Sequence, residues 1–416
     1  MQHFAIADLD LAAEPGRQVL ADLRDRHGEI LAAAATLPRR LFVIRSAWAP
    51  GLAFVGGEAE APGHAGRFSL AGSGETLVDA LASCLGEGVE RVSQIERPDD
   101  VVTPVAGDVC LASAQSLMDS IIASKSGTGG AMPAWCQGTT LATGAPVLVA
   151  ADWCLRRGPN AAFAIPDSAL STGAAAGPDR ATAAARGLLE LIERDAAALW
   201  WLGGKRGRPL AVDGAAMAEA VRLFRVLRHG DDTRQSWLLD ITTDLDIPVI
   251  AAISVDRSGG GFACGLGSRL TLKDAARAAI LELCQLEIGL QLIAIKTAER
   301  GEAALSAVDR RHVARATSID PATCTLIHPL GSPRAEPTAG IAEDTVPLTA
   351  IAAVLSQRAI EAAFVVLTRA EFGIPVVHAS APALQLLPSA IHGPRLRNMI
   401  STTGGGSKDH GGVHLI

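Results

Sequence analysis

The sequence predicts an α+β fold with mixed or antiparallel sheets and long helices that carry pairs of acidic residues. Two observations favour this class. Apolar residues make up 49% of the 416 residues and charged residues only 19%, which allows a sizeable packed core. In addition, long helical segments repeatedly follow pairs of β-like runs, an order typical of α+β layers rather than of a doubly wound sheet.

The N-terminal part of the chain contains two predicted helices with three predicted strands between them. Apolar residues recur at helical spacing over residues 16–37, and this pattern ends at Pro38. The elements expected next are strands at 41–46, 52–56 and 67–71 and a helix that starts near Glu75 and ends before Pro98.

The rest of the chain begins with a polar, Gly-rich segment at 124–132, which we expect to be a loop. A hairpin should follow, because the β-like runs 134–141 and 147–155 are joined by Ala142-Thr-Gly-Ala-Pro146. The remaining expected elements are a long helix at 179–200, strands at 237–242 and 249–255, a third long helix at 272–296, an irregular stretch at 306–345, a helix at 348–362 and strands at 364–367 and 374–379.

These elements divide the chain into three parts. Residues 1–39 are expected to form an N-terminal helical segment, and residues 40–395 the main domain. Residues 396–416 are expected to be a flexible tail, because five glycines lie among the last 13 residues and glycine restricts the backbone least.

Composition excludes several functional classes. The 37 basic and 44 acidic residues give a net charge of −7 with no strongly basic stretch, which argues against nucleic-acid binding. No uninterrupted apolar run approaches the ~18 residues of a membrane span, and the N-terminus lacks the features of a secretory signal. Seven scattered cysteines without a C-x-x-C pair argue against a disulfide framework or a zinc knuckle. We therefore expect a cytoplasmic protein.

Three predicted helices share an internal pattern of acidic residues. The pairs, each separated by three positions, are Glu87 with Glu90, Glu190 with Glu193, and Glu282 with the amide residue Gln285. In the first two helices a glycine lies 13 positions before the first glutamate and an arginine follows the second; these residues are Gly74 and Gly177, Arg91 and Arg194.

Helical geometry gives this spacing a chemical meaning. Residues at i and i+3 lie about 5–6 Å apart on one face of a helix, so each pair directs two side chains to the same region. Apolar neighbours such as Leu191 and Ile192 suggest burial, where like charges require a cation or an arginine. Five carboxylates and one amide form an oxygen-only set, which suits Mg²⁺. The alternative interpretation is that these pairs are solvated surface charges.

Other residues give weaker signals. His64, His378 and His410 lie in unrelated contexts without a partner at a meaningful spacing, so the sequence assigns them no catalytic role. Cys84 and Cys284 lie on the acidic helices and are expected to pack as small apolar side chains.

The same residues resemble the YcaO family over residues 40–385. The motifs that carry the resemblance are Gly72-Ser-Gly74, Trp135-Cys-Gln-Gly-Thr-Thr-Leu-Ala-Thr-Gly144, Ser171-Thr-Gly-Ala-Ala-Ala-Gly177, Ala279-Ile-Leu-Glu282-Leu-Cys-Gln285 and Gly373-Ile-Pro-Val-Val377, together with the two E-x-x-E-R helices. The resemblance implies a YcaO-type layered fold that binds ATP and Mg²⁺ and phosphorylates backbone amides of a ribosomally made peptide. This phosphorylation of the amide oxygen follows the attack of a nucleophile on the amide. A Cys, Ser or Thr side chain as nucleophile gives a thiazoline or oxazoline, sulfide a thioamide, and an amine an amidine.

Roles for individual residues follow from the resemblance. The implied metal ligands are Glu87, Glu90, Glu190, Glu193 and Glu282. The implied nucleotide-binding residues are Ser73, Glu87, Glu90, Arg91, Arg194 and Gln285. The implied catalytic residues are Glu190, Glu193 and Arg194, with Arg194 as a phosphate contact.

Departures from the family pattern leave three functions open. Ser73 replaces the lysine of a frequent Gly-Lys-Gly motif, Thr172 replaces the asparagine of Ser-Asn-Gly, and the Gly-rich end replaces an alternating-proline tail. We favour an azoline-forming cyclodehydratase subunit of the kind that modifies bacteriocins. A thioamide- or amidine-forming enzyme and a non-catalytic scaffold subunit remain alternatives.

The resemblance also implies partners. Besides the precursor peptide, we expect a separate leader-binding protein similar to a ubiquitin-activating enzyme, because the first 40 residues hold little beyond one helix. An FMN-dependent dehydrogenase is a further candidate partner, and a homo- or hetero-oligomer is expected. No nucleic acid and no membrane are expected.

Overall fold

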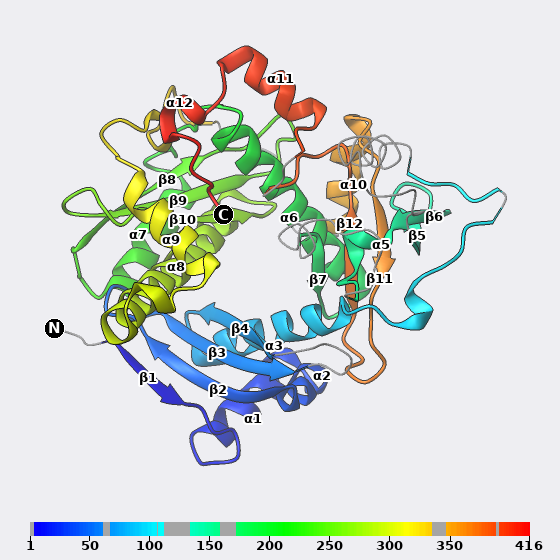
Figure 1. The fold of residues 1–416 in the computed structure, drawn as a ribbon, viewed down its shortest axis with the longest axis horizontal. Coiled ribbons are helices and arrows are strands. Elements are labelled where there is room, and N and C mark those ends of the chain that lie inside the picture. The colour runs from blue at the N-terminus through cyan, green and yellow to red at the C-terminus, as the bar shows by residue number, and fades with distance from the viewer. Residues whose placement is uncertain are drawn as a thin grey trace.

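The computed structural model describes residues 4–60, 67–105, 107–111, 134–158, 172–334, 347–387 and 391–416. In these ranges the chain forms three antiparallel sheets with helices between and around them (Figure 1). The predicted α+β class with antiparallel sheets is confirmed. The Gly-rich segment 124–132, Ser171 of the Ser-Thr-Gly motif and His64 lie outside the described residues.

The first sheet has the strand order β1-β2-β3-β4, and helices α1, α2 and α3 accompany it. Its elements are β1 (Ala5–Asp8), α1 (Gly16–His27), α2 (Glu29–Ala33), β2 (Pro38–Arg45), β3 (Ala53–Glu60), β4 (Arg67–Gly74) and α3 (Leu77–Ser93). Two expectations are wrong here. The helix predicted over 16–37 is interrupted at Gly28, whose φ of 87° is not helical, and β1 joins the N-terminal segment to the sheet. The boundary predicted at residue 40 falls within β2.

The second sheet has the order β6-β5-β11-β12-β7 and brings together distant parts of the chain. Its strands are β5 (Trp135–Thr140), β6 (Pro146–Ala150), β7 (Ala174–Ala176), β11 (Ala363–Val366) and β12 (Val376–Ser380). The neighbouring helices are α5 (Ala151–Cys154), α6 (Arg180–Trp201) and α10 (Pro347–Gln357). The hairpin and the final strand pair were predicted, whereas the three-residue strand β7 was not.

The third sheet has the order β10-β9-β8 and packs against a group of helices. Its elements are α7 (Ala215–Arg228), β8 (Arg234–Asp240), β9 (Val249–Asp256), β10 (Ala263–Ser268), α8 (Leu272–Arg300) and α9 (Ala307–Ser318). The stretch 306–345 was expected to be irregular, but it contains α9, which a Ser306 capping box starts. Helix α7 and strand β10 were also not predicted.

By length and composition alone, α8 could cross a membrane. In the structure it packs against β10 and β9 and carries the fully buried Glu287. These contacts describe a core helix of a folded domain.

Helices α3, α6 and α8 connect the three sheets in a cycle. Helix α3 packs against β4 of its own sheet and against β7; α6 packs against β7 and β12 and against β10; α8 packs against β10 and also contacts β4. Figure 1 shows α6 in the middle of the molecule, between the second and third sheets. Each acidic helix therefore faces the strand that precedes another acidic helix.

The C-terminal segment is packed, contrary to the flexible tail expected for residues 396–416. It forms α11 (Pro394–Thr403) and α12 (Ser407–His410), and its end returns to α6. The Trp201 indole N–H donates to the carbonyl oxygen of Val413 at 2.6 Å, His410 stacks on Trp201, and Leu415 is buried. Glycines at positive φ, such as Gly404 and Gly411, end these short helices, so here glycine shapes turns rather than loosening the chain.

Candidate active site

The three acidic helices begin in the same way. The side chains of Thr76, Asp179 and Thr271 each cap a helix by accepting the backbone N–H three residues later. The first glutamate of each pair follows its cap by 11 residues, and the second acidic or amide residue follows by 14. The internal pattern seen in the sequence is therefore a repeated strand–cap–helix unit.

In each unit the first glutamate turns back to the preceding strand segment. The carboxylate of Glu87 accepts the backbone N–H of Ala71 at 2.8 Å, and that of Glu282 accepts Leu266 at 2.8 Å. Glu190 accepts the N–H of Gly173 at 2.9 Å, just before β7. One oxygen of each carboxylate is thus fixed, and its direction is set by backbone rather than by a flexible partner.

Glycine allows the strand and helix to approach this closely. A Cβ on Gly72 would lie 2.2 Å from both the Ala80 carbonyl oxygen and the Cys84 nitrogen of α3. A Cβ on Gly267 would lie 2.4 Å from the Ala275 carbonyl oxygen of α8. Any side chain at these positions would push the helix and its glutamates away from the strand.

The second residue of two pairs contacts the next unit. Glu90 of α3 accepts the N–H of Ala176 in β7 at 2.7 Å. The Ser73 hydroxyl of β4 donates to Gln285 of α8 at 3.0 Å. The structure therefore places Ser73 and Gln285, two predicted nucleotide-binding residues, in direct contact.

Two arginines contact the acidic residues. Arg194 lies 3.4 Å from Glu190 and 3.5 Å from Glu193, and Arg91 lies 3.2 Å from Glu87. Burial opposes the charge of Arg194, but the carboxylates of Glu193, Glu190 and Glu282 outweigh burial and raise its pKa. Within the described ranges, neither Glu90 nor Glu282 forms an ion pair.

The remaining negative charge is unfavourable in this structure. Burial raises the pKa of Glu90 to about 8, and the neighbouring carboxylates of Glu190 and Glu87 add to the effect. Burial raises the pKa of Glu193 to about 7, with Glu282 and Glu190 adding to it and Arg194 opposing it. Burial also raises the pKa of Glu87 and of Glu282. A bound cation would relieve this repulsion.

The donor set fits Mg²⁺ in kind, because it consists of carboxylate and amide oxygens with excess negative charge. In the part of the chain that the structure describes, no three His, Cys, Asp or Glu side chains already converge on one metal position. The assignment of individual residues to metal, nucleotide or catalysis therefore stays a prediction, while their common location is a finding.

A family model described as YcaO cyclodehydratase, ATP- and Mg²⁺-binding, matches residues 71–385. The chain belongs to the YcaO family. The matched range contains all three acidic units. No curated protein matches the chain by sequence.

Solved structures show the same fold. A heterocyclase in complex with substrate and cofactor matches with a TM-score of 0.69 and 20% identity, over 92% of this chain and 55% of that one. YcaO from Methanopyrus kandleri, bound with AMPPCP and Mg²⁺, matches at 0.61 and 20% identity over 89% and 91%. The E. coli microcin synthetase McbBCD complex matches at 0.58 and 16% identity over 83% and 88%. The chain thus spans about half the length of the heterocyclase.

Sequence reasoning gave Asp195 of this YcaO chain no role, although it directly follows Arg194. Asp195 is fully buried, and its carboxylate accepts the Arg395 guanidinium and the backbone N–H of Gln385 at 2.9 Å. It therefore ties α6, immediately after the acidic pair, to the C-terminal part of the chain. Its signal was its position in the E-x-x-E-R-D run, but the partner lies 200 residues away and is not visible in the sequence.

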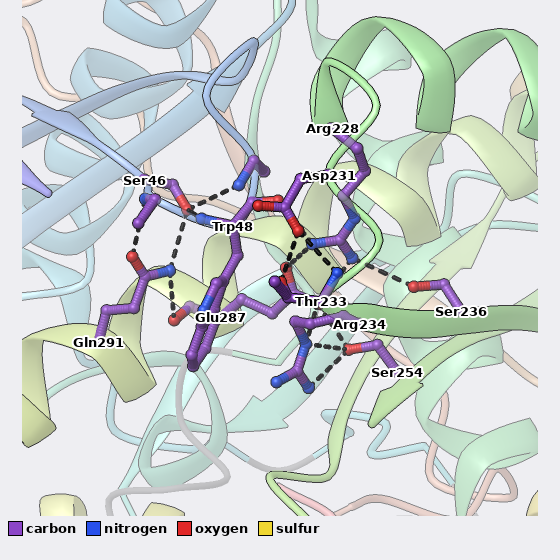
Figure 2. Close-up of polar contacts among 12 residues, drawn as sticks. Ser46, Trp48, Arg228, Asp231, Thr233, Arg234, Ser236, Ser254, Glu287 and Gln291 are labelled. Atoms are coloured by element: carbon purple, nitrogen blue, oxygen red, sulfur yellow. Dashed lines mark hydrogen bonds and ion pairs between the residues drawn. The ribbon is translucent and has the colours of Figure 1, made fainter. Parts of the chain in front are cut away.

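A second unpredicted acidic centre lies further along α8. Figure 2 shows Glu287 among Arg228, Arg234 and Ser254. Arg228 donates two hydrogen bonds to Glu287 at 2.6 and 2.8 Å, Arg234 donates one at 2.9 Å, and the Ser254 hydroxyl donates one at 2.6 Å. Because both oxygens of this carboxylate are bonded by charged donors, the centre is structural and holds α8 against α7, β8 and β9.

Proposed function

We propose that this YcaO protein activates backbone amides of a ribosomally made precursor peptide by ATP-dependent phosphorylation and forms thiazoline or oxazoline rings from Cys, Ser or Thr. The observation that carries the proposal is the repeated unit that directs the acidic pairs of three helices into one region. Its unbalanced negative charge suits Mg²⁺, which in turn can bind the phosphates of a nucleotide, and the family model is described as ATP- and Mg²⁺-binding.

The residues of this chain would act by placement and charge. When bound, ATP and Mg²⁺ supply the phosphoryl group and the positive charge that phosphoryl transfer requires. The backbone-anchored carboxylates of Glu87, Glu190 and Glu282 would hold the metal side of the site. Arg194, already positioned by Glu190 and Glu193, would face phosphate oxygens with its remaining N–H groups.

Partners and location are part of the same proposal. The similar heterocyclase was solved with a substrate, and the similar microcin synthetase is a complex. These likenesses support a bound substrate and partner subunits. We propose that the substrate is a peptide and that the partners are a leader-binding subunit similar to a ubiquitin-activating enzyme and a dehydrogenase. Seven free cysteines and the use of ATP support a cytoplasmic location.

Intact-mass analysis tests the reaction. The purified protein, ATP, Mg²⁺ and the precursor peptide encoded nearest to its gene are incubated with and without the candidate leader-binding protein. We expect ATP consumption and loss of one water per ring only when the partner is present, because docking supplies the proximity that a flexible peptide lacks.

Each other outcome has a defined meaning. Exchange of oxygen for sulfur, or addition of an amine with loss of water, identifies the thioamide- or amidine-forming alternative. Efficient modification without the partner contradicts the need for a leader-binding protein. Peptide modification by the complex that is unchanged when ATP is omitted contradicts the proposed function.

A further inference from the structure

A cavity lies beside the second acidic unit, and the proposed reaction does not use it. Its volume is about 30 Å³, more than the roughly 10–15 Å³ that one water needs. Apolar walls come from Trp153 of α5, Leu191 of α6, and Pro382 and Leu386 after β12. The polar residues at its wall include His378 in β12, Ser380, and Asp152, whose carboxylate is paired with Arg157 at 2.8 Å.

His378 is an unusual core residue. It is 3% exposed, and neither ring nitrogen has a hydrogen-bond partner among the described residues. Burial lowers its pKa to about 4; the Thr172 backbone, which lies near the ring without making a regular hydrogen bond, offsets only part of this effect. The ring is therefore neutral at physiological pH, with one nitrogen as donor and the other as acceptor.

A buried imidazole with two unpaired nitrogens is unfavourable unless a ligand or water completes it. The ligand must be uncharged, because the Asp152 carboxylate at the wall is already paired with Arg157 and a further charge would be desolvated between the apolar walls. It must also be small, and it must be able either to donate or to accept a hydrogen bond, so that it can pair with whichever ring nitrogen it reaches. A hydroxyl group meets all three conditions.

The cavity shares its wall with the candidate active site. Thr172 lines it and directly precedes Gly173, whose N–H binds Glu190. Leu191 lines it and directly follows Glu190. The strand pairing sets His378 opposite Ala174 of β7, and the Ala379 N–H donates to the Gly173 carbonyl oxygen at 2.8 Å. A group in the cavity thus lies beside the residue that follows Glu190 in α6 and beside the residue that precedes its hydrogen-bond partner Gly173.

We propose that this cavity binds the hydroxyl-bearing side chain of a Ser or Thr residue of the peptide, with His378 as its hydrogen-bonding partner. The assignment of the hydroxyl group to a peptide rests on the proposed function. His378 would then help to select which amide reaches the acidic site, as a specificity residue rather than as a metal ligand.

Small neutral probes test the cavity without turnover. Binding of N-acetylserinamide and of N-acetylalaninamide to the full chain is measured by saturation-transfer difference NMR, without ATP or Mg²⁺. We expect N-acetylserinamide to bind at least tenfold more tightly, because the two probes differ only in the hydroxyl group.

Substitution of the ring identifies its role. His378→Phe keeps the ring shape and removes both nitrogens, so it should weaken N-acetylserinamide binding at least tenfold while the melting temperature stays equal or rises. His414→Phe, which changes an exposed histidine, is the matched control and should change neither. A crystal grown with the probe should show its hydroxyl beside His378.

Equal binding of the two probes, unchanged binding by His378→Phe, or a crystal with only ordered water at the ring would each overturn the inference. ATP consumption by a protein that binds no N-acetylserinamide would contradict the proposed hydroxyl-binding site and would leave the proposed function intact. Specific N-acetylserinamide binding by a protein complex that never consumes ATP would support hydroxyl binding in the cavity and would contradict the proposed function.

Discussion

Glu282 and Glu287 lie five residues apart on α8, yet their surroundings differ in kind. Glu287 is completely buried and accepts hydrogen bonds from two arginines and a serine hydroxyl. Glu282 is only partly buried, accepts one backbone N–H, and forms no ion pair within the described residues. Burial raises its pKa, and the nearby carboxylate of Glu190 adds to that effect.

The difference separates a structural carboxylate from one that is available for a ligand. Around Glu287 the charges are complementary inside the protein, so a further cation has no free oxygen to bind. Around Glu282, Glu193 and Glu90 the acidic groups repel one another at fixed positions. A cation bound among them would be attracted by all of these carboxylates and would relieve their repulsion. Both centres are acidic in the sequence, but only the second has unbalanced charge.

The largest expected effect is on stability at Glu287. Glu287→Ala leaves Arg228 and Arg234 buried without their shared carboxylate, which should lower the free energy of unfolding by about 3–5 kcal/mol. Urea denaturation measures this change. Glu299→Ala, at an exposed position of the same helix, should stay within about 0.5 kcal/mol of wild type. A loss below about 1 kcal/mol at Glu287 would show that its ion pairs are not structural.

The next largest effect is on catalytic activity, at the acidic pair of α6. Glu193→Gln and Glu190→Gln should each reduce Mg²⁺-dependent ATP consumption by about 10²–10³-fold, or roughly 2.7–4 kcal/mol of barrier. The stability of Glu193→Gln should be equal or higher, because burial and the neighbouring carboxylates already disfavour the ionised form of Glu193 and raise its pKa to about 7. The assay needs peptide and partner proteins, and Glu361→Gln at an exposed position is the control. Wild-type turnover in either variant would contradict the site assignment.

A smaller effect concerns pH. The pKa values of Glu90 and Glu193 in the folded protein are about 8 and about 7, above the ordinary 4.5. At a pH between the ordinary value and the folded-state value, the folded state therefore binds more protons than the unfolded state. Stability of the metal-free protein should therefore fall as pH rises from about 6.5 to 8.5, by at most about 1.4 kcal/mol per pH unit for each group. The window starts at 6.5 because the lowered pKa values of His312, His378 and His410 act in the opposite sense mainly below the ordinary imidazole pKa, and this opposition fades as pH rises further.

Thermal unfolding with and without Mg²⁺ and ATP checks this prediction. The stabilisation by Mg²⁺ and ATP should grow over the same pH range, since ionised carboxylates bind the cation. Glu90→Gln should show a shallower pH dependence than wild type. A melting temperature of the metal-free protein that rises from pH 6.5 to 8.5, in wild type but not in Glu90→Gln, would show that the sign is wrong.

The sequence was sufficient for the fold class and for the region of the site, and the reasons are local. The i, i+3 acidic pairs and their offset from a glycine are properties of single strand–helix units, and the structure repeats these units with equal cap spacing. The long helices at 179–200 and 272–296 were close to α6 and α8 for the same reason.

What the sequence did not show depends on contacts between distant segments. Strand β7 has only three residues and exists because it pairs with β12, about 200 positions later. The bonds of Asp195 to Arg395 and of Glu287 to Arg228 and Arg234 join separate elements, so no local spacing reveals them. Glycine content misled the interpretation of the C-terminal segment, because flexibility in the unfolded chain says nothing about contacts with Trp201.

The smallest expected effect concerns that C-terminal segment. Deletion of residues 411–416 removes the buried Leu415 and the carbonyl acceptor of Trp201, so the melting temperature should fall. Peptide modification well below that temperature should fall less than about tenfold, or roughly 1.4 kcal/mol of barrier. The reason is that, among the described residues, no hydrogen bond joins 411–416 to a predicted ligand residue. Arg315 donates to the Leu415 carbonyl oxygen and interacts electrostatically with Glu282, so it separates this segment from the acidic site.

The Leu415→Ala variant separates the two effects, since it reduces packing but keeps the backbone. A collapse of modification with unchanged ATP affinity, in the deletion but not in Leu415→Ala, would mean that the terminus takes part in catalysis and would favour the azoline-forming function over the thioamide-forming one.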